Sequence, residues 1–517
     1  MNRIKFFKRR QFVLGPRFLE IEGWRKTEIS KELLLTTHPD LPVHFASTSK
    51  CRLALLGYAI DPFSSDSEEA LLTRMSNHVQ TTLDIVPYLD SLTGRFVLIA
   101  SLPGGDCVYH DAVALRQVQY CQDPSGRTWC GSQAETLADH LGFELDQEIL
   151  DYKTLPAFQN GKSEFWLLNN RTPYREILNL LPNHYLDLDH CKAVRYWPRK
   201  DCIPKLSIEQ SIDLCTPMLV NSIRRASERF DLRMGISAGI DSRKTLACTR
   251  GFSEKISYFS HGITKDTLEV SDVTIPAALL RKLNIKHHAL PLKAMSGEFR
   301  ELFEASSTWA REKKGNNAYT ILEAFGPEIT VLNSNISEVA QCIYWLPKSQ
   351  ITGEGLALLT GLCHPFAINE FQKWLDAAQG ACAESGFDVL ALFFLEQRMG
   401  RWATAAFSEY DIAHETFNPY NNRRLHCHML GVSKSHRFDR RWKVSLRHIK
   451  SLWPEVLNEP INPQDSRWAK IQQYCRRFIV HKLVPHWLPI YPYLRFLKRR
   501  KRFQRQLRSA SLEKTLR

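Results

Sequence analysis

The chain has 517 residues, which is too long for one ordinary hydrophobic core and predicts two or three domains. Its composition, 44% apolar and 24% charged, is typical of a globular protein, and no apolar run approaches the roughly 20 residues of a transmembrane helix. The net charge of +14 lies entirely in residues 466–517, which contain fifteen Lys or Arg and one acid, so a nucleic-acid enzyme is disfavoured.

The thirteen cysteines are scattered and form no C-x-x-C pair, which disfavours both disulfides and zinc. The basic N-terminus is followed by no apolar signal core. We therefore expect a cytoplasmic protein.

Short β-prone runs recur through residues 1–200, and turns such as Pro103-Gly104-Gly105 separate them. The expected strands are residues 52–58, 95–100, 107–110, 118–121 and 184–188, and the expected helices are residues 67–79 and 133–141. A proline-bearing linker at 197–204 ends this β-rich first domain.

Strands and helices alternate in residues 205–462, which predicts a second domain built on a parallel sheet. The expected strands are 232–236, 256–260, 287–290 and 329–333, and the expected helical stretches are 208–230, 272–283, 296–325 and most of the chain beyond 350. Ligands of such sheets bind at the C-terminal ends of the strands. Residues 463–517 form a basic, aromatic tail.

The first of these strands leads into the sequence Ser237-Ala238-Gly239-Ile240-Asp241-Ser242 and then a helical stretch. A turn of small residues lets backbone N–H groups approach a phosphate, and the helix N-terminus adds partial positive charge. The two serines can donate hydroxyls or, alternatively, cap the helix. The carboxylate of Asp241 would repel a nearby phosphate unless Mg²⁺ lies between them. The fragment Gly161-Lys162-Ser163 is a chance match to the Walker loop, since Pro156 stands where that motif needs glycine.

The loop resembles the pyrophosphatase loop, Ser-Gly-Gly-x-Asp-Ser, of N-type ATP pyrophosphatases. Later segments resemble, in the same order, the synthetase domain of asparagine synthetases and their relatives. These segments are residues 258–262, Asp272, residues 332–339, residues 417–425 and residues 443–447. Two departures weaken the match, because Ala238 replaces a loop glycine and the stretch 332–339 keeps one carboxylate, Glu338, and no glycine.

The first domain resembles the class II glutamine amidotransferase half of the same family. The matching positions are residues 93–97, Asp111, Leu115-Arg116, Tyr120 and residues 131–135. The family's nucleophile is an N-terminal cysteine, whereas this chain begins Met1-Asn2-Arg3 and its first cysteine is Cys51. The resemblance therefore implies no glutaminase activity, a loss shared by β-lactam synthetases and lasso-peptide cyclases.

The fold that the resemblance implies is α/β. An Ntn-hydrolase-like αββα β-sandwich at 1–200 would precede a parallel-sheet adenine-nucleotide α-hydrolase-like (PP-loop) domain at 205–462. The implied activity is an AMP-forming amide ligase that uses ATP and Mg²⁺ to adenylate a carboxylate for attack by an amine or ammonia.

The implied site follows the matching positions. ATP and pyrophosphate would contact Ser237, Ala238, Gly239, Ile240, Asp241, Ser242, Ser260, Gly262 and Ser334. Asp241 and Glu338 would hold Mg²⁺, and Lys443 would neutralise the leaving pyrophosphate, so Glu338 and Lys443 are the catalytic candidates. A solvated helix position for Glu338 and a surface position for Lys443 are the alternatives. Glu396, Arg398 and Arg401 line an acceptor pocket or form structural ion pairs.

Two other functions stay open: an ammonia-using asparagine or uronamide synthetase, the latter acting on a surface glycan, and an inactive nucleotide-binding scaffold. The expected substrate is a small-molecule, glycan or peptide carboxylate, no nucleic acid is expected, and a homodimer is an open alternative. Clustered cations beside aromatic residues in the tail, at 466–517, favour an anionic membrane surface and hence the inner face of the membrane. A solvated basic tail is the alternative.

Overall fold

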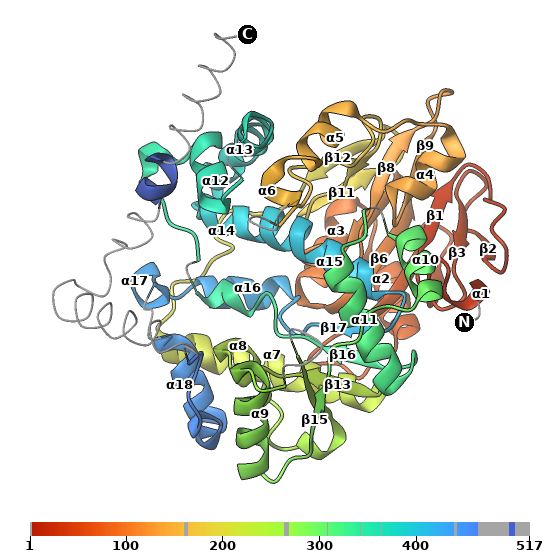
Figure 1. The fold of residues 1–517 in the computed structure, drawn as a ribbon. Helices are drawn as coiled ribbons and strands as arrows, with labels where there is room; N and C mark the ends of the chain where they lie inside the picture. The colour runs from red at the N-terminus through yellow and green to blue at the C-terminus, as the bar shows by residue number, and fades with distance from the viewer. Residues whose placement is uncertain are drawn as a thin grey trace.

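The computed structural model describes residues 3–159, 164–262, 268–307, 309–341, 343–362, 364–438, 442–463 and 496–501. Figure 1 shows the first domain, in red to yellow-orange, above and to the right of the second domain's parallel sheet. The Walker-like fragment at 161–163 lies outside the described residues.

The first domain contains two six-stranded antiparallel sheets, in the orders β10-β8-β9-β1-β3-β2 and β12-β11-β7-β6-β5-β4. Their strands are β1 (Phe12–Gly15), β2 (Arg25–Glu28), β3 (Leu34–Thr37), β4 (Val43–Ser47), β5 (Arg52–Ile60), β6 (Thr93–Leu102), β7 (Gly105–His110), β8 (Gln119–Gln122), β9 (Thr128–Gly131), β10 (Leu178–Asn179), β11 (His184–Asp187) and β12 (Lys192–Arg195).

Alternation along the central strands explains the layers of this domain. Leu56 and Ile99 pack between the two sheets, whereas their neighbours Leu55 and Leu98 pack in the core under the helices. The helices α2 (Glu68–His78) and α3 (Thr82–Ser91) cover one sheet, and α4 (Ala134–Leu141) covers the other. The expected αββα sandwich is confirmed.

The second domain is built on a five-stranded parallel sheet in the order β15-β14-β13-β16-β17. Its strands are β13 (Leu232–Gly235), β14 (Ser257–His261), β15 (His287–Leu290), β16 (Thr330–Leu332) and β17 (Glu415–Phe417). The chain extends the sheet from β13 in one direction with β14 and β15 and in the other with β16 and β17. The topological switch point therefore lies between β13 and β16, where α/β proteins place their ligands.

The remaining helices cover both domains. They are α1 (Arg3–Phe6), α5 (Gln147–Lys153), α6 (Pro156–Gln159), α7 (Ile208–Arg229), α8 (Ile240–Ala247), η1 (Ser253–Lys255), α9 (Ser271–Lys282), α10 (Gly297–Ser306), α11 (Glu312–Phe325), η2 (Ser337–Ala340), η3 (Lys348–Gln350), α12 (Gly353–Thr360), α13 (Pro365–Ser385), α14 (Val389–Phe393), the π-helical η4 (Phe394–Ala403), α15 (Thr404–Tyr410), α16 (Arg423–Leu430), α17 (Lys434–Arg437), α18 (Lys443–Leu452) and η5 (Pro454–Leu457). No helix within the described parts of the chain combines the length and hydrophobicity that a bilayer crossing needs.

The two domains share a buried network of charged residues. Arg95 on β6 forms a two-point ion pair with Asp411 and also donates to Glu415 Oε1 at 2.8 Å. Arg116 donates to the other oxygen of Glu415 at 2.8 Å. Both arginines belong to the segments that resemble an amidotransferase, so these segments hold the second domain in place.

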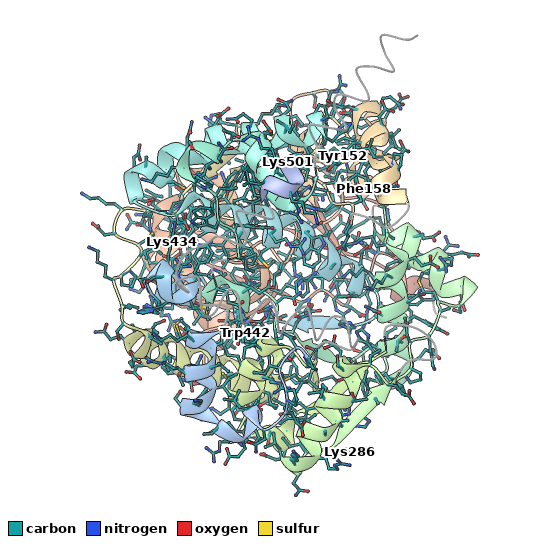
Figure 2. All side chains as sticks on the ribbon, turned by 60° about the vertical axis from the view of Figure 1, so that its left-hand side comes forward. Tyr152, Phe158, Lys286, Lys434, Trp442 and Lys501 are labelled. Carbon is teal, nitrogen blue, oxygen red and sulfur yellow. The ribbon has the colours of Figure 1, made fainter. Side chains whose placement is uncertain are left out.

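Only residues 496–501 of the basic tail are described, and they are helical. Phe496 is buried against the main core, and Arg499 donates to the carbonyls of Leu358 and Leu359 on α12. Figure 2 shows Lys501 far from Lys286, which precedes β15. Membrane contact of the tail stays a prediction, but the ring of Phe496 is already covered by protein.

Candidate functional site

A cavity of about 410 Å³ lies at the C-terminal edge of the parallel sheet, across the switch point. The ends of β13, β14, β16 and β17 supply its walls, together with α11. Seven of the candidate residues line it: Ser237, Gly239, Asp241, Ser242, Ser260, Ser334 and Glu338. The structure therefore brings together residues that are about 100 positions apart.

The loop after β13 is braced by its own serines. The Ser237 backbone N–H donates to Ser242 Oγ at 3.2 Å, and the Gly239 N–H donates to Ser237 Oγ at 3.2 Å. Helix α8 begins at Ile240, so Asp241 lies in its first turn. The first N–H groups of α8 have no acceptor within the helix and supply donors for an anion.

A third N–H of the loop, that of Ala238, is engaged by a residue outside the loop. The Ala238 N–H donates to Asp272 Oδ1 at 3.0 Å, and the Asn462 N–H donates to the Ala238 carbonyl at 3.0 Å. A carboxylate oxygen thus occupies a position at which a phosphate oxygen would accept the same hydrogen bond. A phosphate at that N–H has to displace Asp272.

Asp241 and Glu338 are the two acidic side chains at the switch point. Asp241 Oδ1 accepts hydrogen bonds from Ser337 and Gln341, whereas Oδ2 accepts none from the described residues. The side-chain carboxylate of Glu338 makes no hydrogen bond or ion pair with any described residue, and its backbone carbonyl accepts from the Gln341 N–H at 2.8 Å. Burial, and then the charge of Asp241, raise the pKa of Glu338 to about 7. A nearby cation would therefore stabilise the ionised form of this carboxylate.

The turn that presents Glu338 is strained. Ile336 has a φ of 73°, a left-handed conformation that costs a β-branched residue about 1–3 kcal/mol. Its side chain is fully buried, and that packing opposes the strain. Two residues earlier, the buried Ser334 Oγ has no hydrogen-bond partner and lines the cavity.

Lys244 is a residue that the sequence reasoning missed. It is 2% exposed, its Nζ donates to the Ser337 carbonyl at 3.2 Å, and it lies 4.8 Å from the centre of the Tyr420 ring. Burial lowers the pKa of Lys244, and the charge of Asp241 opposes that shift. Its spacing of three residues from Asp241 on a helix was the available signal.

The wall opposite the loop comes from β17 and the end of α15. His414 Nε2 and Thr416 Oγ1 are buried, line the cavity and have no hydrogen-bond partner. Burial lowers the pKa of His414 to about 4, so its imidazole is neutral at pH 7. Since β17 is only three residues long and lies among helices, the sequence reasoning did not find this wall.

Several candidates do not line the cavity. Ala238 and Ile240 belong to the loop but are buried, and the Gly262 N–H donates to the Leu290 carbonyl. The pKa of Glu209, on α7, is lowered first by its own backbone N–H and then by the charges of Arg447 and Lys443, so Lys443 lies near the start of α7. Lys443 does not line the cavity.

Three of the candidate residues lie on η4, and each of them makes a different contact. Glu396 is fully buried in an ion pair with Arg195, which is the structural alternative. Arg398 stacks on the ring of Trp402 at 3.5 Å. Arg401 lines a second, smaller cavity between the domains. None of the three lines the cavity at the switch point.

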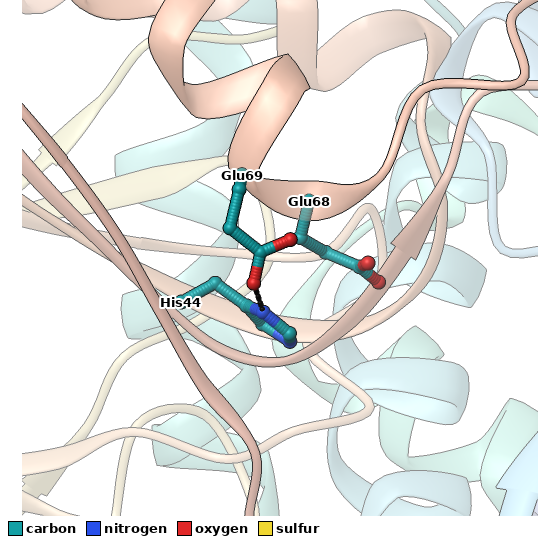
Figure 3. Close-up of side chains that lie close together, drawn as sticks. All are labelled: His44, Glu68 and Glu69. Atoms are coloured by element: carbon teal, nitrogen blue, oxygen red, sulfur yellow. Dashed lines mark hydrogen bonds and ion pairs between the residues drawn. The ribbon is translucent and has the colours of Figure 1, made fainter.

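A separate cluster on the first domain contains His44, Glu68 and Glu69 (Figure 3). His44 Nδ1 lies 2.5 Å from Glu69 Oε1. Glu68 Oε1, however, already accepts from Arg229 at 2.6 Å and from the Ala59 N–H at 3.1 Å. These contacts give Glu68 a structural role in anchoring α7.

No model of a known protein family and no curated protein matches the chain. Among solved structures, an NH3-dependent NAD synthetase from Campylobacter jejuni is 11% identical, with 37% of this chain and 92% of that chain covered and a TM-score of 0.21. A glutamine-dependent NAD+ synthetase from Acinetobacter baumannii is 15% identical, with 46% and 49% covered and a TM-score of 0.20. The glutamine phosphoribosylpyrophosphate amidotransferase of B. subtilis is 13% identical, with 69% and 86% covered and a TM-score of 0.23. Scores this low carry no argument about function, which rests on the geometry of the cavity.

Proposed function

We propose that the chain is an ATP-dependent, AMP-forming amide ligase of asparagine-synthetase type without a glutaminase. The observation that carries this proposal is the convergence of Asp241 and Glu338 on one cavity at the switch point. The carboxylate of Glu338 has no hydrogen-bond partner among the described residues, and its pKa is raised to about 7 by burial and by Asp241. The carboxylate that accepts the amine, and the amine itself, are left to experiment.

The donor set suits Mg²⁺, which prefers carboxylate and other hard oxygen ligands. Asp241 Oδ2 and the carboxylate of Glu338 would hold the ion, and it would neutralise charge on the phosphates. Residues of the chain would bind and orient the rest of the nucleotide. The N–H groups at the start of α8 and the Ser334 hydroxyl orient the triphosphate. Lys244 donates to the backbone carbonyl of Ser337, and the side-chain hydroxyl of Ser337 donates to Asp241, so Lys244 helps to position Asp241.

In the proposed reaction, an oxygen of the substrate carboxylate attacks the α-phosphorus and pyrophosphate leaves. The amine then attacks the acyl carbon and AMP leaves, so that an amide bond forms. Preorganised N–H donors act on the developing charge of the leaving group. The neutral His414, with Nε2 unpartnered in the opposite wall, is placed to accept a hydrogen bond from the attacking amine.

A catalytically inactive nucleotide-binding scaffold is the second candidate, and two observations favour it. No Lys or Arg is among the described residues that line the cavity. In addition, Asp272 already accepts the hydrogen bond of the Ala238 N–H, which a phosphate would need. An acidic cavity of this kind binds a nucleotide weakly without Mg²⁺.

An ATP–pyrophosphate exchange assay over a panel of carboxylates separates the two candidates. The ligase gives exchange with at least one carboxylate, and D241N abolishes it. ATP binding without exchange for any carboxylate would establish the scaffold. The panel includes aspartate and uronic acids, with ammonia as the amine, because these test an asparagine or uronamide synthetase directly.

A further inference from the structure

A second cavity, of about 60 Å³, lies between the two domains. The first domain contributes Gln117, Gln119 and Gln133, and the second contributes Arg401 and Glu409. Helix α15 lines both cavities, with Ser408 and Glu409 facing this one and Tyr410 facing the cavity at the switch point. None of the chemistry proposed above uses the interdomain cavity.

Arg401 is the unusual member of its lining. The residue is 4% exposed, and its Nη2 donates to the Arg171 carbonyl. Its Nε has no partner, and its Nη1 has none among the described residues. A guanidinium carries five N–H donors, so most of its hydrogen-bonding capacity is unmet by the described residues.

The charge of Arg401 is also uncompensated. Burial alone lowers its pKa to about 9, and no carboxylate opposes the shift. The neighbouring acid, Glu409, is already held by Arg311, which donates to it from Nε at 2.9 Å and 3.0 Å. Arg401 therefore remains cationic at pH 7, with no anion of the described protein beside it. A buried charge of this kind costs several kcal/mol unless a ligand pairs with it.

The other walls select for size and shape. The cavity holds about five waters, which is the volume of a small organic acid. Gln119 Oε1 is buried without a partner, so one amide can also receive a proton donor. An aromatic wall is formed by Phe165 and Trp309, whose rings lie 5.6 Å apart. Behind it, Phe158 packs on Phe165 and Tyr152 packs on Phe158.

We propose that the interdomain cavity is a binding site for a small monocarboxylate, held by the guanidinium of Arg401. The two oxygens of a carboxylate can accept hydrogen bonds from two parallel N–H groups of a guanidinium. The single positive charge of Arg401 is balanced by a ligand with a single negative charge. Gln119 binds a hydroxyl or amino group on the acid, and the aromatic wall binds its carbon atoms. The site is independent of the proposed ligase reaction.

Sodium acetate is the probe, with sodium chloride at equal ionic strength as the reference. Isothermal titration should give acetate binding to the full chain with a stoichiometry of one, and a thermal shift should rise with acetate concentration. R401M should weaken acetate binding at least tenfold. R424M, which removes an exposed arginine of α16, should leave it unchanged.

Two further variants keep the test decisive. D241N should bind acetate as the wild type does, because Asp241 belongs to the other cavity; a loss there would place the carboxylate at the ligase site and overturn the proposal. If R401M fails to fold, Q119L replaces it, with lactate as the probe and a loss of at least threefold expected. Equal affinity in the wild type and both pocket variants, or no binding of any monocarboxylate to the wild type, would also overturn it.

Discussion

Asp241 and Glu338 reach one cavity from opposite sides of the topological switch point. Asp241 follows β13 through the first turn of α8, and Glu338 follows β16 through a left-handed turn at Ile336. Burial and the charge of Asp241 raise the pKa of Glu338 to about 7. The pair is therefore a site with excess negative charge, and its properties depend on pH and on cations.

Removal of the Asp241 carboxylate tests the proposed reaction. D241N should lower pyrophosphate exchange by at least a hundredfold, because one of the two ligands for Mg²⁺ is lost. The melting temperature should stay within 2–4 °C of the wild-type value, which corresponds to a change of about 1 kcal/mol in the free energy of unfolding. The side-chain oxygen of the introduced asparagine can still accept the hydrogen bond from Ser337. An unchanged exchange rate would contradict the mechanism.

The raised pKa of Glu338 predicts a pH dependence of stability. Its ordinary pKa is 4.5 and its folded-state pKa is about 7, so the folded protein binds the extra proton between these values. Stability should fall as the pH rises from about 4.5 to 7, by at most about 3 kcal/mol, and remain lower above pH 7. Urea unfolding at pH 5 and pH 8 measures the loss, which E338Q should remove.

Mg²⁺ should act in the opposite sense on the same group. Because the ion binds the ionised carboxylate, it should stabilise the wild type more at pH 8 than at pH 6. E338Q should show a smaller Mg²⁺-dependent thermal shift at both pH values. An identical shift in the variant would mean that the ion binds elsewhere.

Two lysines are candidates for neutralising charge at the site, and paired variants distinguish them. K244M should reduce exchange at least tenfold, because the Ser337 carbonyl loses its donor and Asp241 loses a nearby cation. K443M should change exchange less than threefold, since Lys443 lies near the start of α7. A hundredfold loss in K443M would instead support the role that the family resemblance implies.

The interface between the domains should be sensitive to loss of Arg95. R95M leaves the buried Asp411 without its ion-pair partner and removes one of the arginines bonded to Glu415, so it should lower the free energy of unfolding by about 3–5 kcal/mol. K26M, which removes an exposed ion pair with Glu20, should change it by less than about 1 kcal/mol. Urea titration of both variants measures the difference, and equal small effects would contradict a structural role for the network.

Cys202 should be the most reactive of the described cysteines near neutral pH. A hydrogen bond from the Cys427 thiol, and then the backbone and charge of Arg199, lower its pKa to about 7 against the effect of burial. Alkylation by iodoacetamide, followed by peptide mass spectrometry, should therefore be half-maximal near pH 7. C427A should move this midpoint towards the ordinary value of 9. The same midpoint in both proteins would exclude the thiol hydrogen bond as the cause.

Much of the fold could be predicted from the sequence because long apolar runs repeat with clear periods. The expected strands at 52–58 and 95–100 correspond to β5 and β6, with bounds that differ by at most two residues. The three-residue β17 gave no such signal, and with it the sequence reasoning missed His414 and Thr416. Lys244 was missed because burial of a lysine depends on tertiary contacts with Ser337 and Tyr420 that no local pattern encodes.

The bonds of Asn421 show what the first domain does for the second. This side chain donates to the Gly94 carbonyl and to Asp111, each at 2.7 Å, and accepts from the Val113 N–H at 3.1 Å. The segment that carries it directly follows β17, the strand that forms the far wall of the cavity at the switch point. Residues of the segment that resembles an amidotransferase thus form a contact between the two domains of this chain. Reading Gly94 and Asp111 only as marks of glutaminase activity would therefore overlook the contacts that these two residues make with the second domain.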